Sequence, residues 1–126
     1  MLDASALLAY FFSEPGAEVV EAALPAAMHA VNLAEVLSRL AERGTSPQQA
    51  LDTLAAAGVL QVLRIDAGTV ADASAVAHLR PLTKTSGLSL GDRYCLAFAQ
   101  RLGVPALTAD QAWLALSIGV QVECIR

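Results

Sequence analysis

The chain has 126 residues, of which 56% are hydrophobic and only 16% are charged. This length predicts one compact domain over residues 1–126, and the high hydrophobic fraction excludes an intrinsically disordered chain. The 12 acidic residues outnumber the 8 basic ones and give a net charge of −4. A generally basic nucleic-acid-binding surface is therefore not indicated.

A mean hydropathy of +0.52 raises the question of a membrane segment. The longest uncharged stretch, Ala22–Ala34, is interrupted by Pro25, His29 and Asn32, and it is shorter than the roughly 20 apolar residues that span a bilayer. The first residues, MLDAS, contain no basic segment followed by an apolar one, so we expect no secretory signal and a cytoplasmic location. Cys95 and Cys124 form no CxxC motif, and we expect two buried, reduced thiols.

Turn residues divide the first half of the chain into short elements. In chain order we expect a strand at 1–3, helices at 4–12 and 17–24, a strand at 28–31 and a helix at 32–43. Asn32 and Glu35 have the spacing of a capping box at the start of the last helix, and Gly44 is placed to end it.

The second half alternates in the same way. We expect a helix at 46–58, a strand at 59–65, helices at 67–79 and 89–102, a strand at 104–108, a helix at 111–117 and a strand at 120–125. Ser46, Pro47 and Gln49 form a clear helix start, and Pro81 is expected to end the helix at 67–79. Strands that alternate with helices predict an α/β fold with a parallel sheet covered on both faces.

Four acids lie near predicted helix starts, three of them soon after a strand: Asp3, Glu35, Asp92 and Asp110. In a parallel sheet, residues that follow the strands share one edge, where ligands bind. The simpler interpretation is that each acid caps a helix, since the helix dipole favours acids in the first turn.

Convergence of these acids would require a counter-charge, because several carboxylates close together cannot all stay ionised. Mg²⁺ and Mn²⁺ prefer oxygen ligands, and such ions would attract phosphate without basic side chains. The pattern therefore favours metal-assisted hydrolysis of phosphodiester bonds.

The segments LDASALLAYF, NLAEVLSRL, SLGDRYCLAFAQRLGVPALTAD and QAW occur in this order along the whole chain. They resemble a PIN-domain ribonuclease, and more narrowly the VapC-type toxins of bacterial toxin–antitoxin pairs. The resemblance implies a three-layer α/β/α sandwich with a mainly parallel central sheet. It also implies Mg²⁺- or Mn²⁺-dependent cleavage of RNA, inhibition by a cognate antitoxin, and a homodimer.

The same resemblance assigns roles to individual residues. Asp3, Asp92 and Asp110 would be metal ligands, and Glu35 would bind the metal directly or through water and help to activate the attacking water. The small polar residues of the family pattern match Ser5, Asn32 and Thr108, which would orient a carboxylate or a metal-bound water.

Other polar and aromatic residues carry weaker predictions. Arg93 and Lys84 are candidates for RNA contacts. A salt bridge to a nearby acid explains Arg93 at least as well, and a solvated surface loop is the better explanation of Lys84. Trp113 is expected in the core or at an interface, and Tyr10, Phe11 and Phe12 are expected either in the core or at a dimer or antitoxin surface.

Two alternative functions remain open from the sequence. A receiver-like or phosphatase-like α/β domain also uses Asp and Mg²⁺, but it would show an acidic pair after the first strand and a late lysine, whereas this chain has Asp3 alone and only Lys84. A non-catalytic PIN-like module would use the acids only as helix caps and would bind a protein partner.

Overall fold

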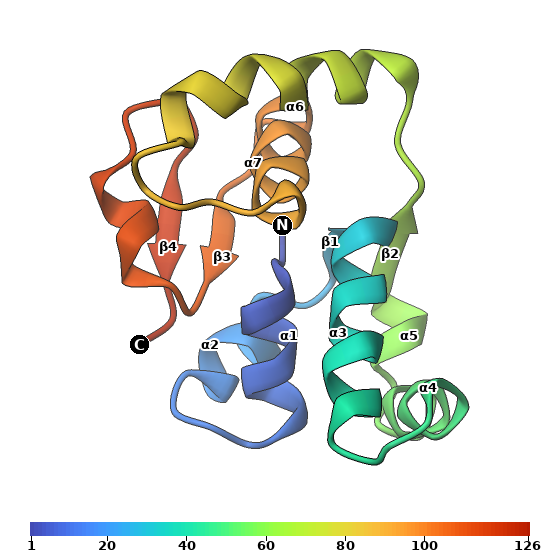
Figure 1. The fold of residues 1–126 in the computed structure, drawn as a ribbon. Coiled ribbons are helices and arrows are strands. Elements are labelled where there is room, and N and C mark those ends of the chain that lie inside the picture. The colour runs from blue at the N-terminus through green and yellow to red at the C-terminus, as the bar shows by residue number, and fades with distance from the viewer.

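The computed structural model describes residues 1–126 and contains eight helical segments and four strands besides the N-terminal segment (Figure 1). The strands are β1 (Ala26–His29), β2 (Leu63–Asp66), β3 (Ala106–Thr108) and β4 (Val122–Cys124). The helices are α1 (Ala4–Phe11), α2 (Ala17–Ala22), α3 (Ala30–Glu42), α4 (Pro47–Ala56), α5 (Val59–Val62), α6 (Val70–Thr83), α7 (Leu90–Leu102) and the 3₁₀ helix η1 (Gln111–Ala115).

The strands form two parallel pairs that the N-terminal segment connects. β1 pairs with β2, and β3 pairs with β4. Leu2 forms a parallel bridge with Leu107 of β3, while its amide donates to the carbonyl of Ala27 in β1 at 2.9 Å. Residues 1–3 therefore lie between β1 and β3, as Figure 1 shows, and complete the order β2, β1, 1–3, β3, β4.

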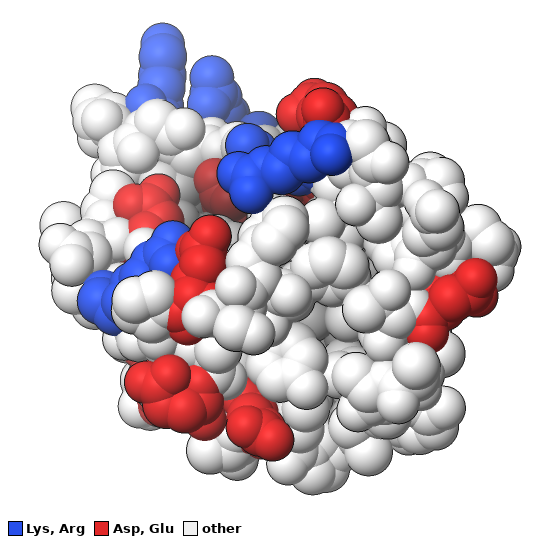
Figure 2. Space-filling model, turned by 90° about the horizontal axis from the view of Figure 1, so that it is seen from below, with Lys and Arg blue, Asp and Glu red and all other residues white.

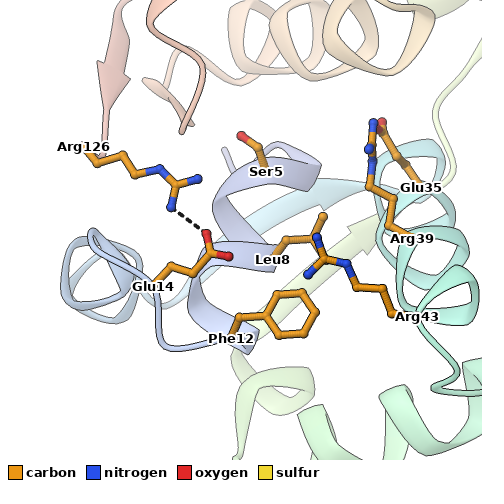
Figure 3. Close-up of a pocket in the computed structure, with 8 residues that line it drawn as sticks. All are labelled: Ser5, Leu8, Phe12, Glu14, Glu35, Arg39, Arg43 and Arg126. Atoms are coloured by element: carbon orange, nitrogen blue, oxygen red, sulfur yellow. Dashed lines mark hydrogen bonds and ion pairs between the residues drawn. The ribbon is translucent and has the colours of Figure 1, made fainter.

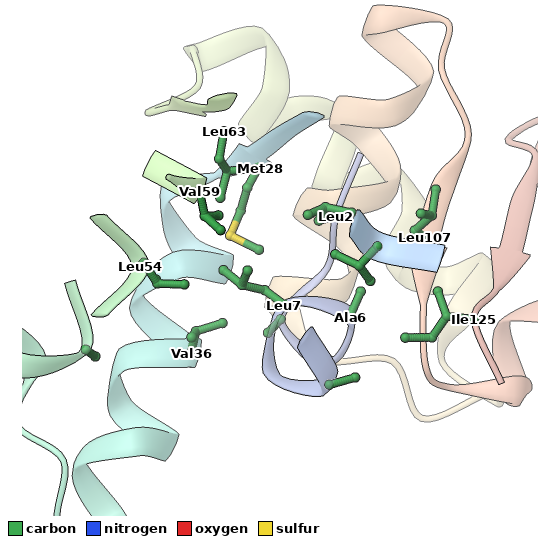
Figure 4. Packing of buried hydrophobic residues seen from close by; sticks show 14 of the residues in the cluster. Leu2, Ala6, Leu7, Met28, Val36, Leu54, Val59, Leu63, Leu107 and Ile125 are labelled. Carbon is green, nitrogen blue, oxygen red and sulfur yellow. The ribbon is translucent and has the colours of Figure 1, made fainter. Parts of the chain in front are cut away.

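Side chains alternate between two hydrophobic clusters on opposite faces of this sheet, because successive residues of a strand point to opposite sides. Leu2, Met28 and Leu107 belong to the cluster beneath α1, α3 and α4 (Figure 4). Their neighbours Met1, Ala27 and Ala106 belong to the cluster under α6 and α7, which also buries Trp113 as expected. The structure is thus the predicted α/β/α sandwich.

Three helices begin with the capping box that the sequence predicts or permits. The hydroxyls of Ser46, Thr69 and Ser89 each accept from the backbone N–H three residues later, and Gln49, Asp72 and Asp92 return the contact. Each box satisfies two amides that a helix start leaves unpaired. The box at Ser89 fixes the start of α7, which carries Asp92 in its first turn.

The start of α3 differs from the prediction. β1 occupies Ala26–His29, not 28–31, and α3 begins at Ala30, so Asn32 is not its cap. The cap is His29, whose Nδ1 accepts from the amide of Val31 at 3.1 Å. An imidazole nitrogen can accept as a carboxamide does, and the expected Asn32–Glu35 capping box is wrong. Glu35 consequently lies in the second turn of α3.

Two other elements also depart from the prediction. Residues 59–62 form α5 instead of strand, because the partner strand β1 begins only at Ala26, which pairs with Leu63. α6 continues through Pro81 to Thr83, where the buried Thr83 hydroxyl donates to the carbonyl of Leu79 at 2.9 Å. Burial of Thr83 and its hydrogen bond to Leu79 outweigh the helix-breaking tendency of proline.

Two smaller expectations can be checked as well. No helix is long and apolar enough to cross a membrane. Both cysteines are free, and Cys95 is buried, but Cys124 is only half-buried because it lies on β4 at the edge of the sheet. The expectation that both thiols are buried is therefore wrong for Cys124.

Candidate active site

Asp3 lies at the end of the N-terminal segment, where α1 begins, and it is only 3% exposed. Its Oδ1 accepts from the amide of Ala6 at 2.7 Å and caps α1. The Ser5 hydroxyl lies within 2.9 Å of both carboxylate oxygens, and the Thr108 hydroxyl donates to Oδ2 at 2.7 Å. Neutral donors alone therefore surround this buried carboxylate, and no Lys or Arg pairs with it.

Burial raises the pKa of Asp3 to about 6 from its ordinary 3.8. The hydrogen bonds from Ala6, Thr108 and Ser5 act in the opposite direction, and the negative charge of Asp92 adds to the rise. Burial also raises the pKa of the Cys95 thiol, with further contributions from Asp3 and Asp92. The negative charge of Asp92, in the first turn of α7, therefore acts on the Asp3 carboxylate.

Ser5 and Thr108 connect Asp3 to the end of β3. The Ser5 hydroxyl accepts from the amide of Ala109 at 2.8 Å, and the Thr108 hydroxyl accepts from the amide of Asp110 at 3.0 Å. Asp110 itself is exposed and caps η1 by accepting from the amide of Ala112 at 2.9 Å. The structure therefore brings Asp3, Ser5 and Thr108 together. Asp110 is connected to Asp3 only through the Thr108 hydroxyl, and its side chain is exposed.

A second contact joins α3 to the first turn of α7 at Gly91. Asn32 is fully buried, and its side-chain amide donates to the carbonyl of Gly91 at 3.1 Å, while its Oδ1 has no hydrogen-bond partner. Glu35 reaches the same point, since a Cβ added at Gly91 would lie 2.8 Å from its Oε2. The missing side chain at Gly91 thus leaves room for Glu35 beside the turn that carries Asp92.

Like Asp3, the other three acids have local partners. Glu35 pairs with Arg39 at 3.3 Å, Asp92 completes the capping box with the Ser89 amide at 2.7 Å, and Asp110 caps η1. The capping interpretation is therefore correct for Asp92 and Asp110, and for Asp3 on α1. No group of three or more His, Cys, Asp or Glu side chains is arranged to hold a metal ion.

The two basic candidates lie outside these contacts. Arg93 donates from Nε to the carbonyl of Ser89 at 3.2 Å and forms no ion pair. Lys84 is exposed at the C-terminal end of α6, and it also lacks an ion pair.

A groove of about 320 Å³ adjoins the site and contains residues that the sequence analysis did not single out. Its polar lining includes Ser5 and Glu35 together with Arg39, Arg43 and Arg126 (Figure 3). Arg39 and Arg43 could have been found from the sequence, because they follow Glu35 by four and eight residues and therefore lie on the same face of the helix. Arg126 gave no such signal, because only the fold brings the C-terminal end to α1.

Comparisons with known proteins show the family to which this chain belongs. The model of one family, the PIN domain, matches residues 1–118. The chain belongs to the PIN domain family. Members of this family are generally nucleases. No curated protein sequence matches this PIN domain.

One solved structure resembles this PIN domain over nearly its whole length. It is a chain of a toxin–antitoxin complex from Klebsiella pneumoniae, with a TM-score of 0.74 and 20% sequence identity, and the match covers 99% of this chain and 96% of that one. The likeness supports the fold, in which the segment that ends at Asp3 lies between β1 and β3. Membership of the PIN family also removes the receiver-like alternative.

Proposed function

We propose that this PIN domain is a Mg²⁺- or Mn²⁺-dependent endoribonuclease. Its active site would consist of four acids, Asp3, Glu35, Asp92 and Asp110. The observation that carries the proposal is the carboxylate of Asp3, buried beside the charge of Asp92 without a cation. Burying an unpaired carboxylate costs stability. A chain that keeps such a group at the ligand-binding edge of its sheet therefore gives it a function beyond capping α1.

The donor set at this edge suits a hard divalent cation, because such ions prefer carboxylate and other oxygen ligands. Asp3 and Asp92 would hold the ion, with Asp110 and Glu35 as further ligands directly or through water. An ion held there would lower the pKa of water and neutralise charge on the phosphodiester.

The chain's own residues prepare this site. Ser5 and Thr108 fix both oxygens of Asp3 in one orientation, which is the role of groups that hold metal ligands in place. Asn32 fixes the first turn of α7 by its bond to Gly91. The local partners of Asp92 and Asp110 are backbone amides, and a carboxylate has further lone pairs with which to bind a cation.

We further propose that this nuclease is the toxin of a toxin–antitoxin pair and forms a homodimer. The support for the first part is the chain from the toxin–antitoxin complex, which shares this fold over its whole length. The antitoxin would inhibit cleavage by covering the edge of the sheet at Asp3. The half-buried rings of Tyr10 and Phe11 and the exposed ring of Phe12 remain candidates for the surfaces between chains.

The decisive experiment compares the wild type with Asp92→Asn. The wild-type protein should cleave single-stranded RNA in the presence of Mg²⁺ or Mn²⁺ and should stop when the ions are chelated. Asp92→Asn should abolish cleavage while it keeps the fold, because an Asn oxygen can still accept from the Ser89 amide. Asp52→Asn on the exposed face of α4 is the matched control.

The second candidate, a non-catalytic module, is favoured by the capping contacts of Asp92 and Asp110. It makes the opposite prediction for the same experiment. Wild-type protein without metal-dependent cleavage, or full activity in Asp92→Asn, would refute the catalytic assignment and leave that module as the better description.

A further inference from the structure

The groove beside the site is continuous with it. Ser5, which bonds to Asp3, and Glu35, which reaches Gly91, both line this groove of about 320 Å³. From there it runs over α1, past Leu8 to Phe12. Figure 3 shows Arg39 and Arg43 of α3 on one side and Arg126 from the C-terminal end on the other. If one nucleotide of a nucleic-acid strand lies at Asp3, the neighbouring nucleotides can lie in this groove.

The groove collects three of the eight basic side chains of the chain: Arg39, Arg43 and Arg126. It also contains two carboxylates, Glu35 and Glu14, so its lining has a net charge of +1 in a protein whose total is −4. On the face shown in Figure 2 the blue side chains form separate groups, some of them next to red ones, and no continuous basic surface is seen. Electrostatic attraction for an anion such as phosphate is therefore restricted to local sites such as this groove.

Of the three arginines that line the groove, Arg43 alone has no carboxylate partner. Its guanidinium lies 4.7 Å from the centre of the Phe12 ring, and it forms no ion pair. Stacking on an aromatic ring holds the planar group in place and leaves its N–H donors free. Those donors match the geometry of phosphate oxygens, which arginine binds with two parallel hydrogen bonds.

The other two arginines form ion pairs that are open to solvent. Arg39 is 60% exposed in its pair with Glu35, and Arg126 is 39% exposed in its pair with Glu14 at 2.6 Å. Exposed ion pairs of this kind contribute about 0–1 kcal/mol. Both arginines can therefore exchange a carboxylate for a phosphate at little cost.

We propose that this groove binds the phosphate backbone of the RNA strand next to the cleaved bond. Arg43 makes the principal phosphate contact, and Arg39 and Arg126 add contacts once they leave their carboxylate partners. The inference rests on the proposed ribonuclease function, since it assigns the groove to the same substrate. A protein partner in the groove is the alternative that the test must distinguish.

The test measures binding of a fluorescent single-stranded RNA to the Asp92→Asn variant, which holds RNA without cleaving it. Arg43→Gln is added to this background and removes the charge while it keeps a long polar side chain. We expect binding to weaken roughly tenfold, the equivalent of one charge-assisted hydrogen bond. We also expect the slope of log affinity against log salt to become shallower by about 0.7, the value for one phosphate contact on a single strand.

Arg80→Gln in the same background is the matched control, because Arg80 is an exposed cation on α6 outside the groove. It should leave both quantities unchanged. Thermal melting should show that neither substitution alters the fold.

The outcomes separate the two proposals. If wild-type protein cleaves RNA but Arg43→Gln binds it with unchanged affinity and salt slope, the groove proposal fails and the nuclease proposal survives. If wild-type protein neither binds nor cleaves RNA, both fail. If Arg43→Gln weakens binding of a second protein chain and leaves RNA binding intact, the groove is a protein interface and the RNA assignment is wrong.

Discussion

Replacing Asp3 by Asn should stabilise the metal-free protein and at the same time abolish its activity. The variant removes a negative charge from a position that is 3% exposed and has no cationic partner. It can keep the local hydrogen bonds, because its amide oxygen still accepts from the Ala6 N–H and its amide NH₂ can donate to the hydroxyl of Ser5 or Thr108. The two effects separate the proposed functional role from simple helix capping.

The magnitude follows from the pKa of Asp3, which burial raises from 3.8 to about 6. One pH unit of difference corresponds to roughly 1.4 kcal/mol, so the buried charge costs up to about 3 kcal/mol. Well below pH 3.8 the carboxyl is protonated in both folded and unfolded chains, and its ionisation does not contribute to the free energy of unfolding. As the pH rises from 3.8 to about 6, the unfolded chain ionises first and the cost appears, and above pH 6 it is complete.

The assay is thermal or urea unfolding of wild type and Asp3→Asn without metal at several pH values. At pH 7 the variant should be more stable by about 1–3 kcal/mol, or roughly 4–12 °C in Tm for a domain of this size. The difference should vanish near pH 4. Mg²⁺ or Mn²⁺ should raise the Tm of the wild type more than that of Asp3→Asn. An ion stabilises the folded state only when it is bound there, and the variant lacks the Asp3 carboxylate that would bind it.

Asp52→Asn provides the control, since this exposed carboxylate on α4 should show no such pH-dependent gain. A variant at Asp3 that is less stable than wild type at pH 7 would refute the reasoning, because it would mean that the carboxylate supports the fold instead of costing stability. So would a difference in stability that stays constant from pH 4 to pH 7.

Two further predictions concern the contact at Gly91 and the core. Gly91→Ala should reduce RNA cleavage at least about tenfold, because the new Cβ would lie 2.8 Å from Glu35 Oε2 and force that side chain to move. The stability of the variant should stay within about 1 kcal/mol of wild type, since Ala favours the helix and the Glu35 side chain can move. Unfolding and cleavage assays on the same sample check this, and unaltered cleavage would show that the position of Glu35 is unimportant. Leu7→Ala should lower the free energy of unfolding by about 2–5 kcal/mol, because Leu7 is fully buried with Met28 and Val36 (Figure 4). Urea unfolding measures this loss, and a loss below about 1 kcal/mol would mean that the core collapses to fill the cavity.

Where local signals were strong, the sequence was sufficient. Ser46 with Gln49 predicted the start of α4 because a capping box involves only residues close in the chain. Ser89 and Asp92 form the same kind of box at the start of α7. The alternation of strands and helices predicted the parallel sheet for a similar reason, since hydrophobic periodicity is also local. Asp3 could be selected because residues that follow parallel strands share one edge, whereas Ser5 and Thr108 were selected only through the resemblance to the PIN family.

Where the outcome depended on a distant partner, the sequence was not sufficient. Residues 59–62 have a strand-like composition but form α5, because the neighbouring strand β1 begins only opposite Leu63. Asn32 looked like a helix cap, yet it is buried against Gly91 of α7, 59 residues away. Pro81 did not end α6, because the buried Thr83 keeps the last turn helical.

By itself, the sequence predicted the α/β architecture and selected four acids as candidate metal ligands. Only the tertiary structure decided their state: Asp3 is buried with neutral donors, Glu35 pairs with Arg39, and Asp110 stays exposed. Only the tertiary structure also placed Arg126 beside α1 and α3 to line one groove with Arg43. The physical reason is that burial and charge pairing depend on contacts between segments far apart in the chain, which local patterns do not encode.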